Sequence, residues 1–347
     1  MARGHGTLDA ARSVNAFFSG PLLALETSCD ETAAAVLVGS EIKSSVVASQ
    51  IELHGKWGGV VPEAAARAHV EALLPTMDTA LADSGIGLEA IEAVAVTNRP
   101  GLIGALSVGV SAAKALAFRR NLPLIGVHHI EGHVCSPLAV DSALEPPSLA
   151  LIVSGGHTEL VRVEAWGKYV VLGETLDDAA GEAFDKGARV LGLGYPGGVA
   201  VQAAAVGGDP LRYALPQSAT DRPTNFSFSG LKTAVARLVE REGPKLNAAD
   251  AAASLQHAIV EVLATKTVAA AEAESLRTIV VAGGVSANLA LRTRVAELGL
   301  RSGVRVIVPP LPLCTDNAAM IGLAGSLRLA RGERSGFDLD VLSSEPL

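Results

Sequence analysis

Short apolar runs separated by small polar residues recur along the chain, and they predict β-strands joined by tight turns. One pair of runs covers residues 22–25 and 33–38. A second pair covers residues 149–153 and 159–163, and the segment between them is Ser154-Gly155-Gly156-His157-Thr158. We expect each pair to form two strands whose connecting turn can wrap backbone N–H groups around an anion.

The same plan continues after each pair with a strand, a glycine turn and a helix. Residues 93–96 lead into an Ala-rich helix near residues 107–118. Residues 278–281 lead through Gly283-Gly284 into a helix near residues 288–298. A strand that ends at a helix N-terminus presents N–H groups to phosphates or carboxylates. The repetition predicts a duplicated α/β fold with two lobes.

The second copy is longer than the first, which indicates a mainly helical insertion in the second lobe. Residues 141–147 contain Asp, Ser, Glu and two prolines, which interrupt the hydrophobic pattern and favour a lobe boundary there. The predicted organisation is a disordered extension over 1–20, a first lobe over 21–145, a second lobe over 146–330 with the insertion at about 173–266, and a polar tail over 331–347.

The composition favours two lobes with densely packed cores. The chain has 347 residues, more than one hydrophobic core usually serves. Hydrophobic residues make up 49% of the chain and aromatic residues 3%. Cores of this kind consist of Ala, Val, Leu and Gly, which suit helices that lie close on sheets.

The apolar runs, the cysteines and the charge exclude several classes of protein. Gly, Ser or a charge interrupts every apolar run before the roughly 18 residues of a membrane span, and residues 1–20 lack the apolar block of a secretory signal. Three scattered cysteines, Cys29, Cys135 and Cys314, form no disulfide framework and fit the cytoplasm. The net charge of −8 argues against broad attraction to nucleic acid and leaves room for a local basic patch or a basic partner.

Two histidines and one aspartate are candidate metal ligands. His129 and His133 lie four residues apart after a predicted strand, and on a helix this spacing puts both imidazoles on one face. The alternative is a cluster of solvated histidines at a helix start. The best third ligand is Asp316, which precedes the apolar segment 318–329 and is equally an ordinary helix N-cap. Two imidazoles and a carboxylate suit Zn²⁺ or Fe²⁺.

Further polar residues are candidates for binding a nucleotide. Glycine turns in matching places of the two lobes are moderately specific for a nucleotide cleft. Asn288, after the second glycine turn, can hydrogen-bond a ribose or a base. Asp185 lies in an acidic segment and can accept hydrogen bonds from ribose hydroxyls, although such segments are usually solvated helix faces. The segment Tyr195-Pro196-Gly197-Gly198 forms another turn that permits close backbone approach.

These motifs together closely resemble the tRNA N6-adenosine threonylcarbamoyltransferase family, the bacterial TsaD proteins once called O-sialoglycoprotein endopeptidases. The resemblance spans residues 21–330, with Arg99 where the family pattern leads us to expect a glycine. It is carried by Glu26-Thr27-Ser28-Cys29-Asp30-Glu31-Thr32, residues 128–133, 154–158 and 179–186, Phe226-Ser227-Phe228-Ser229-Gly230-Leu231-Lys232, residues 282–288 and Cys314-Thr315-Asp316-Asn317.

The resemblance implies a fold, a reaction and a set of partners. The fold would be the actin/Hsp70/hexokinase-like (ASKHA) pair of lobes. The activity would be transfer of threonylcarbamoyl from L-threonylcarbamoyladenylate to N6 of adenosine-37 in tRNAs that read codons starting with adenine, with release of AMP. A TsaB-like paralogue and a TsaE-like ATPase would be partners.

The resemblance also implies roles for individual residues. One metal ion, Fe²⁺ or Zn²⁺, would be held by His129, His133 and Asp316. The binding site for the adenylate would be lined by Ile152, Val153, Ser154, Gly155, Gly156, Asp185, Gly198 and Asn288. Asp30 is the candidate for accepting the proton of the adenine amine, and its alternative role is to order the turn in which it lies.

Three other functions compete with this interpretation. An ATP-dependent small-molecule or sugar kinase uses duplicated anion turns on the same fold but needs no His129/His133/Asp316 set. A metalloprotease is suggested by the paired histidines, although Glu131 does not stand next to the first one as in His-Glu-x-x-His. A non-catalytic scaffold would leave the cleft motifs without a purpose.

Overall fold

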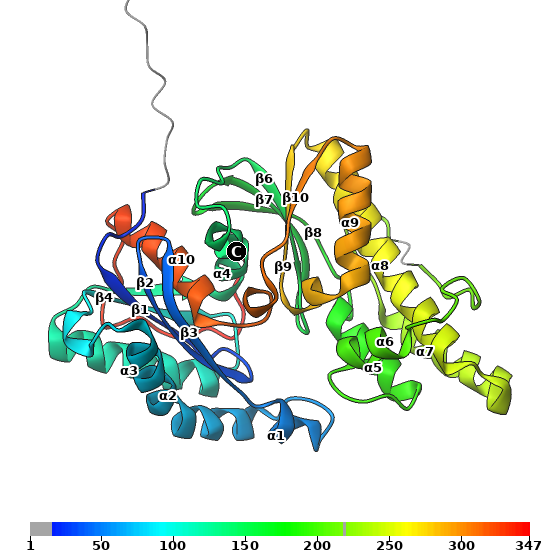
Figure 1. The fold of residues 1–347 in the computed structure, drawn as a ribbon, viewed down its shortest axis with the longest axis horizontal. Helices are drawn as coiled ribbons and strands as arrows, with labels where there is room; N and C mark the ends of the chain where they lie inside the picture. Colours follow the sequence, from blue (N-terminus) through cyan, green and yellow to red (C-terminus); the bar gives the residue numbers. More distant parts are fainter. Residues whose placement is uncertain (1–15, 218–219) are drawn as a thin grey trace, which may run out of the picture.

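Two five-stranded sheets form the framework of the molecule (Figure 1). The computed structural model describes residues 16–217 and 220–347. The first sheet has the order β3-β2-β1-β4-β5, in which β2 pairs antiparallel with β1 and β3, and β4 pairs parallel with β1 and β5. Its strands are β1 (Pro21–Glu26), β2 (Glu31–Val38), β3 (Glu41–Ser49), β4 (Ala93–Arg99) and β5 (Leu124–His128).

The second sheet repeats this plan. Its order is β8-β7-β6-β9-β10, again with antiparallel pairs on the β8 side and parallel pairs on the β10 side. Its strands are β6 (Ser148–Val153), β7 (Thr158–Ala165), β8 (Lys168–Glu174), β9 (Thr278–Ala282) and β10 (Arg305–Ile307). The predicted duplication and the two-lobed α/β class are therefore confirmed.

Alternation along the strands gives each sheet two apolar faces. In β1, Leu23 and Leu25 belong to one core cluster and Leu22 and Ala24 to another. This follows from the two-residue period of a strand. The face with Leu23 packs on α2 (Pro62–Ser84) and α3 (Ile103–Arg120). Short helices near this lobe are α1 (Ile51–Gly55) and η1 (Leu88–Ala90).

Helices cover the outer face of the second sheet as well. Residues of α8 and α9 form one core with β6 and β9. The span predicted as a helical insertion contains α5, α6, α7 and the first part of α8, as Figure 1 shows on the side away from the first sheet. The helices of this lobe are α5 (Ala180–Val190), α6 (Gly197–Ala204), α7 (Ser229–Glu242), η3 (Gly243–Lys245), α8 (Ala248–Ala273), η4 (Gly284–Ala287) and α9 (Leu289–Arg301).

The helix that follows the last strand of each copy contacts the sheet of the other copy. α4 (His129–Cys135) and η2 (Ser136–Ala139) follow β5, and α4 contacts β6 and β9 of the second sheet. α10 (Ala318–Ala330), which follows β10 and η5 (Leu311–Leu313), packs on β1 and β2 of the first sheet and against α4. The expected second lobe, 146–330, thus includes a helix that packs on the first sheet, because the inner face of that sheet needs an apolar cover.

Both described ends of the chain pack on the first lobe. Residues 1–15 of the expected extension lie outside the described residues, whereas Phe17 and Phe18 pack against the core between the sheets. The segment expected as a polar tail runs along the edge strand β5, where Ser335 pairs with Leu124 and Leu339 packs on the core. Covering an edge strand blocks pairing with other chains. None of the described helices is long and apolar enough to span a membrane.

Candidate functional site

The candidate metal ligands lie where α4 meets the segment that leads into α10. His129 is the first residue of α4 and His133 lies one turn later, and both side chains are buried. Gly132, between them, allows close packing, because a Cβ there would lie 2.7 Å from Cδ1 of Ile321 in α10. Asp316 is not the N-cap of α10. That role belongs to Asn317, whose side chain accepts a hydrogen bond from Met320 N.

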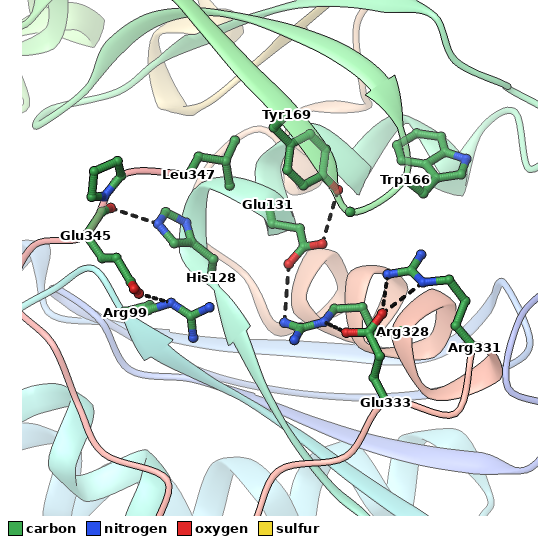
Figure 2. A pocket seen from close by; sticks show the side chains of 12 residues that line it. Arg99, His128, Glu131, Trp166, Tyr169, Arg328, Arg331, Glu333, Glu345 and Leu347 are labelled. Carbon is green, nitrogen blue, oxygen red and sulfur yellow. Dashed lines mark hydrogen bonds and ion pairs between the residues drawn. The ribbon is translucent and has the colours of Figure 1, made fainter.

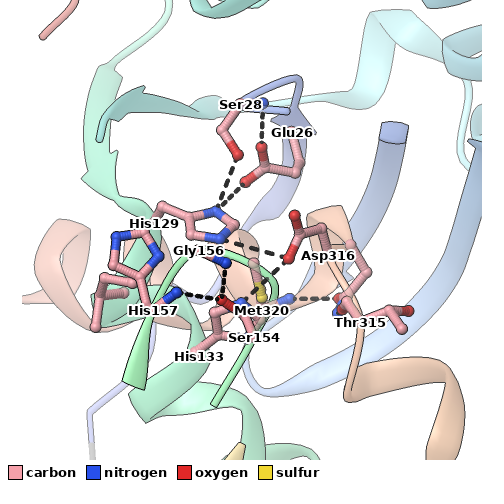
Figure 3. A network of polar contacts seen from close by, with 12 residues as sticks. Glu26, Ser28, His129, His133, Ser154, Gly156, His157, Thr315, Asp316 and Met320 are labelled. Atoms are coloured by element: carbon pink, nitrogen blue, oxygen red, sulfur yellow. Dashed lines mark hydrogen bonds and ion pairs between the residues drawn. The ribbon is translucent and has the colours of Figure 1, made fainter. Parts of the chain in front are cut away.

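The structure brings the three predicted ligands together (Figure 3). The distance from Asp316 Oδ1 is 3.4 Å to His129 Nε2 and 3.2 Å to His133 Nε2. The three ligand atoms all lie within 4.8 Å of one another. Since His129 and His133 follow a strand of the first sheet and Asp316 follows one of the second, the cluster joins the two copies of the fold.

A carboxylate and a hydroxyl contact the far side of the His129 ring. Glu26 Oε2 and Ser28 Oγ each lie 3.1 Å from His129 Nδ1 (Figure 3). Both residues belong to the segment after the first predicted strand, and sequence reasoning did not assign them to the site. Among the described residues, His133 Nδ1 is buried without a hydrogen-bond partner.

The electrostatics of the cluster favour a cation between these groups. Burial alone would raise the pKa of Asp316, but His129 and His133 hold that pKa well below its usual range. Burial alone would lower the pKa of His129, but Asp316 and Glu26 raise it well above its usual value. Burial lowers the pKa of His133, so this ring is neutral and its lone pair is available at neutral pH. Two imidazole nitrogens and one carboxylate oxygen fit Zn²⁺ or Fe²⁺.

The predicted adenylate residues of β6 reach the site only through their backbone. Ile152 and Val153 have fully buried side chains that belong to the cores on the two faces of the sheet. In the following turn, Ser154 Oγ accepts hydrogen bonds from Gly156 N at 3.3 Å and His157 N at 3.0 Å. These two N–H groups are therefore already hydrogen-bonded to a hydroxyl within the turn. Gly155 and Gly156 are exposed, which permits close approach of a ligand.

The remaining predicted adenylate residues lie on the second lobe near α6 and α9. Asp185 Oδ1 accepts a hydrogen bond from Gly197 N at 2.6 Å, and Gly198 is the next residue of α6. Burial raises the pKa of Asp185, although the bond to Gly197 opposes this. Asn288 is nearly buried, where its Oδ1 caps α9 and its Nδ2 donates to Gln256. Its polar groups therefore have structural partners.

Asp30 lies beside an acidic neighbour that the sequence did not single out. Burial and the charge of Asp30 raise the pKa of Glu31 to about 9. Glu31 therefore carries a proton at neutral pH, and its side chain is hydrogen-bonded to Asp30. Asp316 contributes to the same shift, which places the Asp30/Glu31 pair in the electrostatic range of the three-ligand cluster.

Comparison with known proteins shows the family of the chain. The family described as "TsaD: tRNA N6-adenosine threonylcarbamoyltransferase" matches residues 41–323. The chain belongs to this family. A tRNA N6-adenosine threonylcarbamoyltransferase of Synechococcus sp. (strain JA-3-3Ab) is 54% identical over 333 residues, covering 93% of this chain and 91% of the relative. One of Geobacter sp. (strain M21) is 52% identical over 330 residues, covering 94% and 96%.

A solved structure supports the fold. The crystal structure of full-length HypF in the phosphate- and nucleotide-bound form superposes with a TM-score of 0.61 at 13% sequence identity, covering 92% of this chain and 47% of HypF. At that identity the likeness concerns the fold alone. It agrees with the two related sheets of this TsaD family member.

A charged pocket lies on another side of α4 and includes none of the predicted site residues (Figure 2). Glu131, from the same helix as the two histidines, accepts hydrogen bonds there from Tyr169 at 3.1 Å and Arg328 at 3.4 Å. Arg99, where we expected a glycine, pairs with Glu345 of the C-terminal segment. Because these charges are paired with one another, the pocket holds the C-terminal segment against the first lobe.

Proposed function

We propose that this chain transfers threonylcarbamoyl from L-threonylcarbamoyladenylate to N6 of adenosine-37 in tRNAs that read codons starting with adenine, and releases AMP. It is then an acyltransferase. The observation that carries the proposal is the convergence of His129, His133 and Asp316 between the two copies of the fold, in a member of the TsaD family.

The proposed cofactor is one Fe²⁺ or Zn²⁺ ion held by His129 Nε2, His133 Nε2 and Asp316 Oδ1. Three protein ligands leave coordination positions open, as in catalytic rather than structural sites. When bound, a divalent cation supplies a Lewis acid that polarises or orients the threonylcarbamoyl group. The chain's own contribution is to keep the three donor atoms within 4.8 Å of one another.

The residues of the proposed adenylate site belong to the second lobe. Asp185 would accept hydrogen bonds from ribose hydroxyls, since one bond to Gly197 leaves a carboxylate with further acceptor capacity. The backbone of Gly155, Gly156 and Gly198 would permit close approach of the AMP moiety. Asn288 would act mainly by capping α9, because its side chain is already bonded to Leu291 N and Gln256.

The transfer step needs a proton acceptor, for which we propose Asp30. The N6 amine of adenine is a poor nucleophile because its lone pair is delocalised into the ring. A bond forms from N6 to the carbamoyl carbon, the bond from that carbon to the AMP phosphate oxygen breaks, and one proton leaves N6. The neighbouring Glu31, whose pKa is raised to about 9, is protonated at neutral pH and is therefore not the acceptor.

The proposal also includes a fold type, a cellular location and two partner proteins. We assign the fold to the actin/Hsp70/hexokinase-like (ASKHA) type, supported by the matching strand orders of the two sheets. The three cysteines are free, which supports a cytoplasmic location. The net charge of −8 supports the involvement of a TsaB-like paralogue and a TsaE-like ATPase in holding tRNA.

The site geometry disfavours the metalloprotease. A helical zinc protease places a glutamate beside the metal as general base. Here Glu131 is bonded to Tyr169 and Arg328 in the pocket of Figure 2, away from the histidine cluster of Figure 3. A kinase leaves the His129/His133/Asp316 cluster without a role.

The test is reconstitution with purified components. The chain, with and without the two partner proteins, is incubated with threonine, bicarbonate, ATP, an adenylate-forming enzyme and unmodified tRNA, and the tRNA nucleosides are analysed. We expect threonylcarbamoyladenosine from the wild type, and a joint loss of metal content and product for His133→Ala, because this change removes one of the three proposed protein ligands. Wild-type chain that yields no modified nucleoside with every partner present contradicts the proposal.

A further inference from the structure

The last residue of β1 places a charged group in the interior of the first lobe. Glu26 is fully buried, with a relative exposure of 0%. A buried carboxylate is costly unless hydrogen bonds and charges compensate for the lost water. Glu26 therefore needs hydrogen-bond donors or positive charges around it that compensate for the lost water.

The hydrogen bonds of Glu26 show which partners these are. Oε1 accepts a hydrogen bond from Ser28 N at 2.5 Å. Oε2 accepts one from Thr97 Oγ1 at 2.6 Å and faces His129 Nδ1 at 3.1 Å. The backbone N–H can only donate, so Oε1 is fixed toward Ser28 and Oε2 is fixed toward the imidazole.

We propose that Glu26 is a positioning residue that fixes the tautomer of His129. An ionised carboxylate only accepts hydrogen bonds, and Glu26 Oε2 lies 3.1 Å from Nδ1 whereas Asp316 Oδ1 lies 3.4 Å from Nε2, so the shorter contact keeps the ring hydrogen of neutral His129 on Nδ1. The lone pair of Nε2 is then directed at the position shared with His133 and Asp316. This inference rests on the proposed metal site, and it assigns Glu26 the role of preparing one ligand before the ion arrives.

The other neighbour of Nδ1 does not determine the tautomer. Ser28 Oγ also lies 3.1 Å from His129 Nδ1, but a hydroxyl can donate or accept. For His133, no described residue bonds Nδ1, so nothing on that side selects its tautomer. Glu26 is thus the group that holds the hydrogen of His129 on Nδ1, against the longer contact from Asp316 to Nε2.

The variant Glu26→Gln tests this at nearly constant volume. Because Ser28 N still requires an oxygen, the Gln amide nitrogen lies where Oε2 was and donates to His129 Nδ1. That moves the ring hydrogen to Nε2, which then cannot bind a metal. Ser28→Ala is the matched control, since it removes a contact to the same ring atom without changing the tautomer.

The measurement is Zn²⁺ affinity of the purified full-length chain by competition with a chromophoric chelator, with thermal unfolding as a check of the fold. We expect Glu26→Gln to weaken Zn²⁺ binding by about 10- to 100-fold, and Ser28→Ala to change it by less than about threefold. Equal affinity of Glu26→Gln and wild type overturns the positioning role while the metal site stands. Wild type that binds no Zn²⁺ overturns the metal site, and this inference with it.

A second measurement does not use Glu26→Gln, so the proposal stays testable even if that variant misfolds. Long-range ¹H–¹⁵N correlation spectra of the metal-free wild type report which imidazole nitrogen carries the hydrogen. The spectra are recorded at a pH high enough to deprotonate the ring, and we expect His129, identified by its absence in His129→Gln, to carry the hydrogen on Nδ1. A neutral ring with hydrogen on Nε2 overturns the proposal.

Discussion

Replacing Asp185 separates its structural role from its proposed binding role. Its Oδ1 accepts a hydrogen bond of 2.6 Å from the backbone N–H of Gly197, the first residue of α6. This bond holds α6 against α5 and satisfies one of the N–H groups that a helix start leaves unpaired. Asp185→Ala should therefore lower stability as well as adenylate affinity, in contrast to a residue that only binds ligand.

The structure sets the size of both effects. A hydrogen bond to a charged group is worth about 1.5–3 kcal/mol. With an unfolding entropy of roughly 2.1 cal/mol/K per residue over 347 residues, that loss lowers Tm by about 2–4 °C. If Asp185 also accepts ribose hydroxyl bonds, a loss of the same size weakens adenylate binding by about 10- to 100-fold.

Asp185→Asn is the matched control, because its amide oxygen still accepts the bond from Gly197. We expect it to recover most of the lost Tm but not the affinity. Calorimetric titration with a non-hydrolysable adenylate analogue and thermal unfolding of the three proteins test this. If Asn and Ala lower Tm equally, the Gly197 bond does not stabilise α6. If Ala leaves the affinity unchanged, Asp185 does not belong to the adenylate site.

Two further substitutions test the framework around the site. His128 is buried with Nδ1 bonded to Ile130 N, and burial lowers its pKa to about 4. Between pH 6.5 and 4 the unfolded chain therefore binds more protons than the folded chain, so the free energy of unfolding falls by up to about 3 kcal/mol as the pH drops through that range. Urea unfolding of His128→Asn should lack this pH-dependent contribution. A difference in unfolding free energy between wild type and variant that stays constant with pH contradicts it. Gly283 has φ +90°, and a Cβ there would lie 2.4 Å from Val153 O, so Gly283→Ala should lower the free energy of unfolding by about 2–4 kcal/mol. Gly284→Ala should be tolerated, because the nearest atom to a Cβ at Gly284 is 3.9 Å away. Equal urea midpoints of the two variants would refute this.

The duplicated framework could be predicted because it depends on local patterns. The run 22–25 is short, apolar and followed by polar residues, and it corresponds to β1. The glycine turn at Gly283 separates β9 from α9, as its positive φ requires. Helix α2 lies outside the predicted elements, and Pro75 in its interior interrupts the local helix signal.

Residues whose partners are distant in sequence could not be assigned from patterns. Glu26 contacts His129, which is 103 positions away, and only the folded sheet brings them together. Asn288 is expected at the ribose, and its amide also donates a hydrogen bond to Gln256 of α8, a partner that the sequence did not indicate. The N-cap role expected for Asp316 belongs to its neighbour Asn317, because a shift of one residue decides which side chain faces the helix start.

The position of the candidate metal centre follows from the exchange of helices between the two copies. α4 contacts strands of both sheets, while α10 follows the second sheet in the chain and packs on the first. Since α4 and α10 also contact each other, residues at the starts of the two helices lie close together. His129 starts α4 and Asp316 directly precedes the cap of α10, so the ligands come from equivalent points of the two copies. The contact between these two helices thus brings a histidine and a carboxylate together between the lobes, and Glu26 of β1 contacts the far side of the histidine ring.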